Sequence, residues 1–182
     1  MCLEMSKKIT VICVEGSGSS SRDESSTISN GLRKALEGHR YVASFEVHEF
    51  NPVWWWIKRK KIGRILKKTK HTDGILFVGK SLGAYRLIKC IDDMKWITRF
   101  SRSALVTIDP YAPFGKCGQH NSVDVPEFVD WSRNVFQIDS YPGGAVVVGA
   151  KNIQEFGVDH MSIVNTKSVM AAYIDAIVSL VR

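Results

Sequence analysis

The feature that most constrains this chain is Ser81, which lies between two glycines at the junction of an apolar run and a helical run. Residues 74–78 (GILFV) are bulky and apolar, which is typical of a strand buried on both faces. Over residues 84–91, apolar side chains recur at helical spacing. Gly79 and Gly83 would allow the strand and the helix to pack closely. The pattern G-x-S-x-G therefore predicts a sharp strand-to-helix turn that holds the Ser81 hydroxyl above the edge of a sheet.

The same residues also satisfy a second pattern. Gly74, Gly79, Lys80 and Ser81 match the phosphate-loop pattern G-x-x-x-x-G-K-[ST], in which backbone N–H groups between the glycines cradle phosphates. Residues 75–78 favour a buried strand, whose N–H groups bond neighbouring strands instead. The flanks therefore favour the strand-to-helix turn, and a phosphate-loop NTPase stays as the alternative.

Strand-like and helix-like segments alternate along the chain. Apolar runs predict strands at 9–14, 42–50, 74–78 and 104–108, and helical spacing predicts helices at 28–36, 53–68, 82–94 and 170–181. Segments 134–139 and 145–150 are expected to form either a hairpin or successive members of the main sheet. We expect an irregular connection at 110–131 to form the rim of a site. The alternation predicts one α/β domain over residues 1–182, a three-layer α/β/α sandwich with a mostly parallel central sheet.

Composition narrows the class of protein. The chain has 182 residues, of which 45% are hydrophobic, and no stretch has the length of a membrane-spanning helix. The first residues lack the apolar core of a secretion signal. The four cysteines (Cys2, Cys13, Cys90 and Cys117) are scattered without metal-ligand spacing and are interpreted as free thiols. These features predict a cytoplasmic protein; the sequence does not indicate its oligomeric state.

The net charge of +7 is concentrated in residues 51–70, which hold eight cations and no acid. Three consecutive tryptophans, Trp54 to Trp56, precede all eight of these cations. Because three successive side chains cannot share one face of a helix, we expect at least one indole to be exposed. Residues 53–70 could bind an anionic membrane or another acidic surface, or could form an ordinary outer helix with solvated lysines. The segment contains no recognisable nucleic-acid-reading motif.

A reactive serine at the predicted turn needs a base, and the base needs a carboxylate to orient it. His160 lies after the last predicted strand and before the last helix, where loops cover the carboxyl ends of the strands. His120, in the long connection, is the alternative base. Asp109 and Asp139 each end a predicted strand and are both candidates for the acid.

Three segments together resemble the small lipase and esterase branch of the α/β-hydrolase superfamily: 79–83, 108–110 (Ile-Asp-Pro) and 158–160 (Val-Asp-His). The resemblance extends from Ile9 to the final helix. It identifies residues 79–83 as the nucleophile elbow and implies the chain order serine, acid, histidine. The strand-end Asp109-Pro110, with proline again at position 113, is similar to the acid motif of some lipases. The resemblance therefore favours Asp109 over Asp139.

The same resemblance implies cofactor-free, metal-free hydrolysis of a small ester or lipid-like substrate through an acyl-enzyme. The backbone amides of Leu82 and Ser17 would stabilise the oxyanion. Many relatives carry His-Gly in the loop where this chain has Glu15-Gly16. A hydrolase-like protein without catalytic activity, binding anionic partners through its basic segment, stays as a further alternative.

Overall fold

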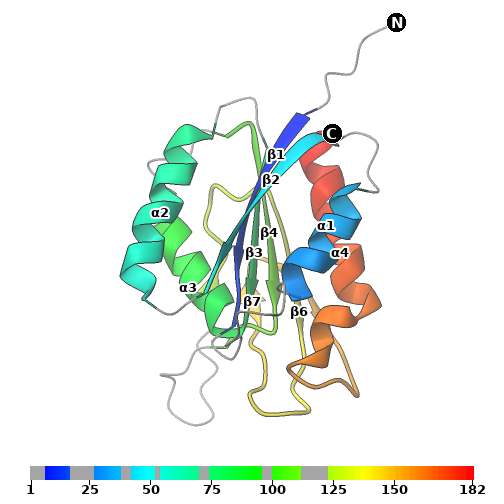
Figure 1. Cartoon of the computed structure of the whole chain (residues 1–182). Helices are drawn as coiled ribbons and strands as arrows, with labels where there is room; N and C mark the ends of the chain where they lie inside the picture. The colour runs from blue at the N-terminus through cyan, green and yellow to red at the C-terminus, as the bar shows by residue number, and fades with distance from the viewer. Residues whose placement is uncertain are drawn as a thin grey trace, which may run out of the picture.

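The computed structural model describes residues 7–16, 27–37, 42–51, 54–69, 74–95, 100–111 and 123–182. Within these residues, six strands form one sheet in the order β2-β1-β3-β4-β6-β8, and all neighbouring strands are parallel (Figure 1). Two short strands pair separately, also in parallel. The strands are β1 (Lys7–Val14), β2 (Val42–Phe50), β3 (Gly74–Lys80), β4 (Arg102–Ile108), β5 (Val123–Asp124), β6 (Trp131–Phe136), β7 (Val147–Val148) and β8 (Lys151–Gln154).

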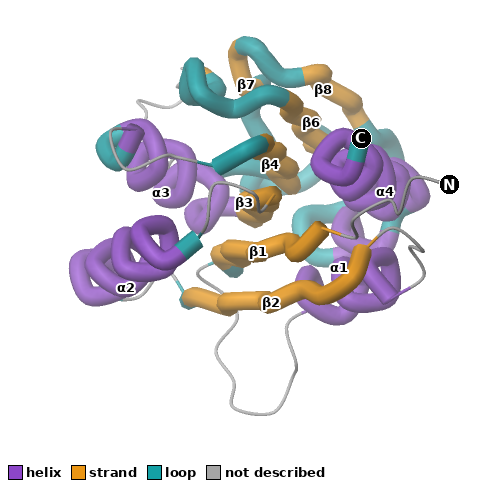
Figure 2. The backbone as a smooth tube through the Cα atoms, turned by 90° about the horizontal axis from the view of Figure 1, so that it is seen from above, coloured by secondary structure: helices purple, strands orange, loops and turns teal. Residues whose placement is uncertain are grey.

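Helices cover both faces of the main sheet. Figure 2 shows α2 and α3 on one face and α1 and α4 on the other. Among the described residues, no helix combines the length and the apolar character needed to cross a bilayer. The elements are α1 (Thr27–Glu37), α2 (Trp55–Lys68), α3 (Ser81–Asp92), a 3-10 turn η2 (Ser162–Asn165) and α4 (Lys167–Val181).

Two apolar cores hold the three layers together. One core joins the sheet to α1 and α4, and the other joins it to α2 and α3. All seven residues of β3 are buried, because this central strand has helices on both faces. Its continuous apolar run is what such a position requires, since side chains on both faces of the strand leave water. The predicted three-layer sandwich with a parallel sheet is confirmed.

The phosphate-loop interpretation is wrong. Residues 75–78 lie inside β3 and are paired with β1 on one side and β4 on the other. Their N–H groups therefore belong to a sheet ladder and cannot surround a phosphate.

The prediction for the last two strands is partly wrong. The sixth strand begins three residues earlier than expected, at Trp131, and ends at Phe136. Segment 145–150 neither forms a hairpin with it nor joins the main sheet, because Val147 and Val148 pair with β5. The main-sheet strand is the next segment, Lys151–Gln154, parallel to β6. Its polar sequence gives no apolar signal because it is the edge strand, where four residues are only half-buried or exposed.

The strand register aligns the carboxyl ends of the central strands. Lys80 of β3 pairs with Ile108 of β4, and Ile108 pairs with Val135 of β6. The next residues, Ser81 and Asp109, therefore leave the sheet side by side. This edge, at the bottom of Figure 1, also receives the segments before η2 and before α2. We call it the carboxyl edge.

Candidate active site

Ser81 occupies the sharp turn between β3 and α3. Its φ angle is 54°, in the left-handed region that non-glycine residues rarely adopt. Residues forced into this conformation concentrate at functional sites, where the surrounding structure maintains the strain. The Ser81 side chain is buried, with 5% of the residue exposed. The predicted strand–turn–helix junction is therefore present, with the serine at the bend.

The two glycines that flank Ser81 permit this turn through close packing. A methyl group at Gly79 would lie 2.5 Å from the Ala84 Cα atom, and one at Gly83 would overlap the Glu15 carbonyl oxygen. Real carbon atoms do not approach backbone this closely, so a larger side chain at either position would push β3, α3 or the end of β1 apart. Close packing therefore explains why both positions of the sequence pattern are glycines.

The segment after β1 lies against the serine. A methyl group at Gly16 would lie 3.2 Å from the Ser81 Cβ atom and 3.7 Å from its Oγ atom. The backbone at Gly16 therefore borders the space above the hydroxyl. Leu82 is the second residue of α3, so its N–H belongs to the helix N-terminus, where backbone donors lack helical partners. Ser17, the other predicted oxyanion residue, lies outside the described residues.

Asp109 and His160 are joined directly. The His160 Nδ1 atom lies 2.5 Å from Asp109 Oδ2, and the two residues are 51 positions apart in sequence. Asp109 is fully buried, while His160 is half-buried. Asp109 also has a positive φ angle, 47°, immediately after β4. The structure therefore brings together the aspartate and the histidine that the resemblance favours.

Gln137, one residue beyond β6, fixes the Asp109 carboxylate. Its backbone N–H donates to Oδ1 at 3.0 Å and its side-chain Nε2 donates to Oδ2 at 3.0 Å. Gln137 is itself held, since the Ser140 N–H donates to Gln137 Oε1 at 2.8 Å. A buried carboxylate is costly unless donors surround it, and here three donors do so. Sequence analysis missed Gln137, which lies inside the predicted strand segment 134–139 and belongs to no motif.

Gly144 packs directly on the same carboxylate. A methyl group there would overlap Asp109 Oδ1 and lie 2.9 Å from the Phe136 Cβ atom. At the neighbouring Gly143, a methyl group would meet nothing closer than 3.7 Å. The two adjacent glycines thus differ in how closely they approach the acid.

The turn that carries His160 is fixed by its own backbone contacts. The His160 N–H donates to Ser140 Oγ at 3.2 Å. Asp159 Oδ1 accepts from the N–H groups of Met161 and Ser162 at 2.8 and 2.7 Å. The Ser162 N–H is the main cause that lowers the pKa of Asp159. These contacts orient the residue before and the residues after the imidazole.

Asp139, the alternative acid, has a different role. It is exposed, and its Oδ2 atom accepts from the Gly157 N–H at 3.0 Å, which ties the segment after β8 to the segment after β6. The structure therefore places Asp109, and not Asp139, against the His160 ring. His120, the alternative base, lies outside the described residues.

Lys80, the residue before the serine, is buried at the same edge. Loss of hydration lowers the pKa of its ammonium, while the negative charges of Glu15, Asp109 and Asp159 act in the opposite direction. The cation thus sits among carboxylates close to Ser81. Among the described residues, no group of three or more His, Cys, Asp or Glu side chains could hold a metal ion.

Within the described residues, no hydrogen bond joins the Ser81 hydroxyl to His160. In enzymes without substrate, such bonds are often long and tighten only when substrate binds. The carboxyl edge nevertheless carries a strained serine, a histidine and a buried carboxylate from neighbouring segments. A nucleophile, a base and an orienting group are the parts that acyl transfer needs.

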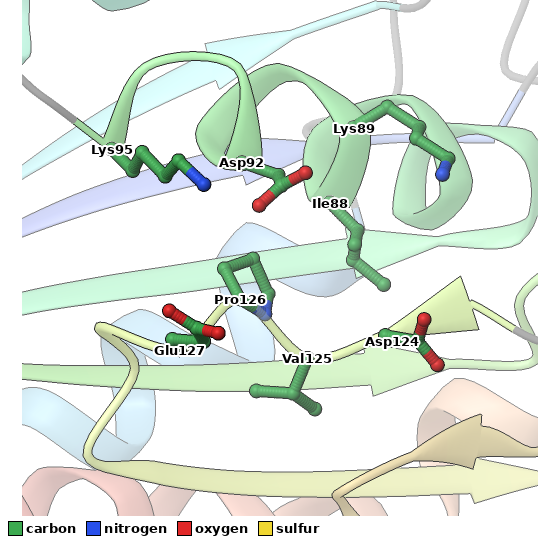
Figure 3. Close-up of a pocket in the computed structure, with 8 residues that line it drawn as sticks. All are labelled: Ile88, Lys89, Asp92, Lys95, Asp124, Val125, Pro126 and Glu127. Atoms are coloured by element: carbon green, nitrogen blue, oxygen red, sulfur yellow. The ribbon is translucent and has the colours of Figure 1, made fainter.

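A polar pocket of about 200 Å³ lies near the other end of α3 (Figure 3). Asp92, which helps to line it, is eleven residues beyond Ser81, or about 16 Å along the helix axis. This pocket is therefore separate from the serine. Its lining residues are Ile88, Lys89, Asp92, Lys95, Asp124, Val125, Pro126 and Glu127.

The parallel sheet, the helices on both faces and the strained serine at the turn after β3 are features of the α/β-hydrolase fold. No protein-family model matches the sequence, and no curated protein is significantly similar to it. A crystal structure from Xanthomonas campestris pv. campestris, described as a "putative hydrolase of the alpha/beta superfamily", is similar in structure, with a TM-score of 0.58. The match covers 94% of this chain and 99% of that one, at 15% sequence identity. At this identity, the likeness establishes the α/β-hydrolase fold alone.

Proposed function

We propose that this protein is a serine hydrolase that cleaves carboxylic esters through an acyl-enzyme. The observation that carries the proposal is the meeting of distant segments at one edge of the sheet. Ser81 leaves β3 with a φ angle of 54°, and Asp109 leaves the adjacent strand and bonds His160. The Xanthomonas protein described as a "putative hydrolase" shares this fold and supports the general class of reaction. The ester preference comes from the resemblance of the sequence motifs to small lipases and esterases.

In the acylation step, Ser81 Oγ attacks the ester carbonyl carbon and His160 Nε2 accepts the hydroxyl proton. The Nδ1–H of His160 donates to Asp109, which holds the ring in the tautomer that leaves Nε2 free to accept. Asp109 also stabilises the imidazolium that forms. The backbone amides of Leu82 and Ser17 donate to the oxyanion of the tetrahedral intermediate. His160 then returns its proton to the alcohol as the alcohol leaves.

In the deacylation step, His160 removes a proton from water, and the resulting nucleophile attacks the acyl-Ser81 carbonyl. The same oxyanion donors act again, and the protonated His160 returns the proton to Ser81 as the acid is released. Thioesters and amides react by the same sequence of steps. The bond type therefore depends on the substrate pocket rather than on the catalytic residues.

The test is hydrolysis of p-nitrophenyl esters of increasing acyl length, measured on the native chain and on Ser81→Ala. We expect Ser81→Ala to lower kcat by about 10⁴- to 10⁶-fold for every ester that is cleaved. The matched control is Ser179→Ala, which should retain activity. Ser179 lies on α4, and its hydroxyl donates to the Ala176 carbonyl oxygen. Full ester hydrolysis by Ser81→Ala would exclude the proposal. The rate as a function of acyl length would define the substrate class.

A further inference from the structure

The most exposed apolar side chains gather at the carboxyl edge. Of the ten large apolar side chains that are exposed among the described residues, seven are more than half exposed, and they lie at the start of α2 or in the segments after β6 and β8. Their exposed fractions run from 54% to 88%, whereas the other three are 42% to 49% exposed. We call these seven residues the apolar rim: Trp54, Trp56, Ile57, Ile138, Tyr141, Phe156 and Met161.

The rim has two parts on either side of the candidate site. Trp54, Trp56 and Ile57 lie where α2 begins, after β2 at one end of the sheet. The other four lie after β6 and β8, at the opposite end of the sheet. In Figure 1 both groups of segments lie at the lower edge, with the turns after β3 and β4 between them. The rim therefore flanks Ser81 and Asp109.

Three of the four aromatic members of the rim, Trp54, Trp56 and Tyr141, make contacts with another ring. The rings of Trp54 and Trp56 meet edge to face at 5.0 Å, and Trp54 has a left-handed φ angle of 56° just before α2. Tyr141 meets Tyr111 edge to face at 6.3 Å, and their hydroxyls are 3.3 Å apart. Exposed indole and phenol rings are typical of the boundary between water and lipid, where the apolar ring and its polar atom both find partners.

Positive charge adjoins one part of the rim. Helix α2 carries seven cations and no acid. Arg59 pairs with Asp93, and Lys61 lies over the Phe50 ring. Lys60, Arg64 and Lys68 are exposed and spaced four residues apart, in line with the exposed Trp56. A basic helix with exposed tryptophans at its first turn is complementary to an anionic lipid surface.

We propose that the carboxyl edge docks on an anionic phospholipid bilayer. The apolar rim enters the boundary between headgroups and acyl chains, and the cations of α2 attract the anionic headgroups. The candidate active site then faces the membrane, and a substrate reaches it from the lipid. Docking depends on the rim and on α2, not on the proposed chemistry, so Ser81→Ala must bind vesicles as the native chain does.

The experiment measures flotation of the full-length Ser81→Ala protein with vesicles at 0.1 M and 0.5 M salt. One set of vesicles is phosphatidylcholine, and the other contains one-quarter phosphatidylglycerol. We expect at least about tenfold stronger binding to the anionic vesicles at low salt, and weaker binding at high salt. Equal binding to both lipids, or no binding to either, would overturn the proposal. Tighter binding to a single-stranded oligonucleotide than to anionic vesicles would also overturn it, in favour of a nucleic-acid partner.

Variants test each part of the surface. Trp54→Ala combined with Trp56→Ala should reduce vesicle binding about tenfold or more, and Phe156→Ala should also reduce it. The controls are Ile174→Ala and Lys34→Glu, which replace an exposed apolar residue of α4 and an exposed cation of α1. Both variants should bind vesicles as strongly as the Ser81→Ala protein does. If Phe156→Ala binds normally while Arg64→Glu with Lys68→Glu abolishes binding, the helix alone lies on the membrane and edge-on docking is wrong. Circular dichroism of these surface variants verifies that they are folded.

Discussion

Residues 79–84 hold Ser81 in place by contacts among near neighbours and with the end of β1, whereas Asp109 and His160 meet across 51 positions of sequence. On the serine side, glycines allow close backbone packing. On the acid–histidine side, hydrogen bonds from Gln137 and the contact with Gly144 hold a buried carboxylate. A change on the serine side should therefore disturb packing and stability first. A change on the acid–histidine side should disturb a charge and the orientation of a ring, and so activity first.

Apart from the loss of Ser81 itself, the largest effect is expected for the acid. Asp109→Asn keeps the shape of the side chain but removes the charge that selects the His160 tautomer, so kcat for ester hydrolysis should fall by about 10⁴-fold. Asp139→Asn is the matched control, because Asp139 contacts the Gly157 N–H and not the imidazole; its kcat should stay within about twofold. Similar losses in the two variants would remove Asp109 from the proposed mechanism.

The second prediction uses the two adjacent glycines near the acid. Gly144→Ala places a methyl group against Asp109 Oδ1, displaces the carboxylate and should lower kcat about 10²-fold, since small misplacements of catalytic groups have effects of this size. Gly143→Ala meets only ordinary contacts and should leave kcat nearly unchanged. Steady-state kinetics of both variants measure this difference; equal kcat values would show that the close approach of Gly144 does not matter.

The third prediction addresses the serine side. Gly83→Ala should lower the free energy of unfolding by about 1–3 kcal/mol, because the methyl group would overlap the Glu15 carbonyl. Gly31→Ala, in α1, meets only the Tyr173 ring at 3.5 Å and should raise the free energy of unfolding by about 0.5–1 kcal/mol, because alanine favours a helix. Urea denaturation measures both values. A stabilised Gly83→Ala variant would mean that α3 and β1 can move apart at little cost.

The smallest effect concerns Cys90, a buried residue of α3 in the apolar core between the sheet and helices α2 and α3. Burial raises the pKa of the Cys90 thiol to about 12. Above about pH 9 the unfolded chain loses this proton while the folded chain keeps it, so the folded state binds more protons and stability falls as pH rises. At pH 10 this contribution is about 1 kcal/mol. Urea denaturation at pH 8 and pH 10 should show a smaller loss for Cys90→Ala than for the native chain; equal losses would show that Cys90 does not titrate in this way.

The features that could be predicted from sequence are those with local causes. The apolar runs of β1, β3 and β4 are continuous because helices bury both faces of these strands, and the serine turn has its glycines within two residues. The expected exposure of at least one indole is also confirmed: Trp54, just before α2, and Trp56 are exposed, while Trp55 is half-buried.

The features that could not be predicted depend on contacts between distant segments. Strand β8 is polar and lies at the edge of the main sheet, while residues 147–148 pair with β5. No local pattern of apolar residues indicates which of these two segments joins the main sheet. Gln137 has no sequence signal of its own, because its importance arises only where β6 ends beside Asp109. Strand ends alone do not separate Asp109 from Asp139, since both follow strands; only the resemblance of Asp109-Pro110 to a lipase motif favoured Asp109 before its contact with His160 was known.

The central claim, that Ser81 is a nucleophile activated by His160, is tested most directly by labelling with a fluorophosphonate, followed by intact-mass and peptide mapping. The account predicts one adduct per chain, located on Ser81, and a labelling rate at least about 10³-fold lower in His160→Ala. A chain that stays unlabelled while it hydrolyses esters, or an adduct on another residue that persists in His160→Ala, would contradict it.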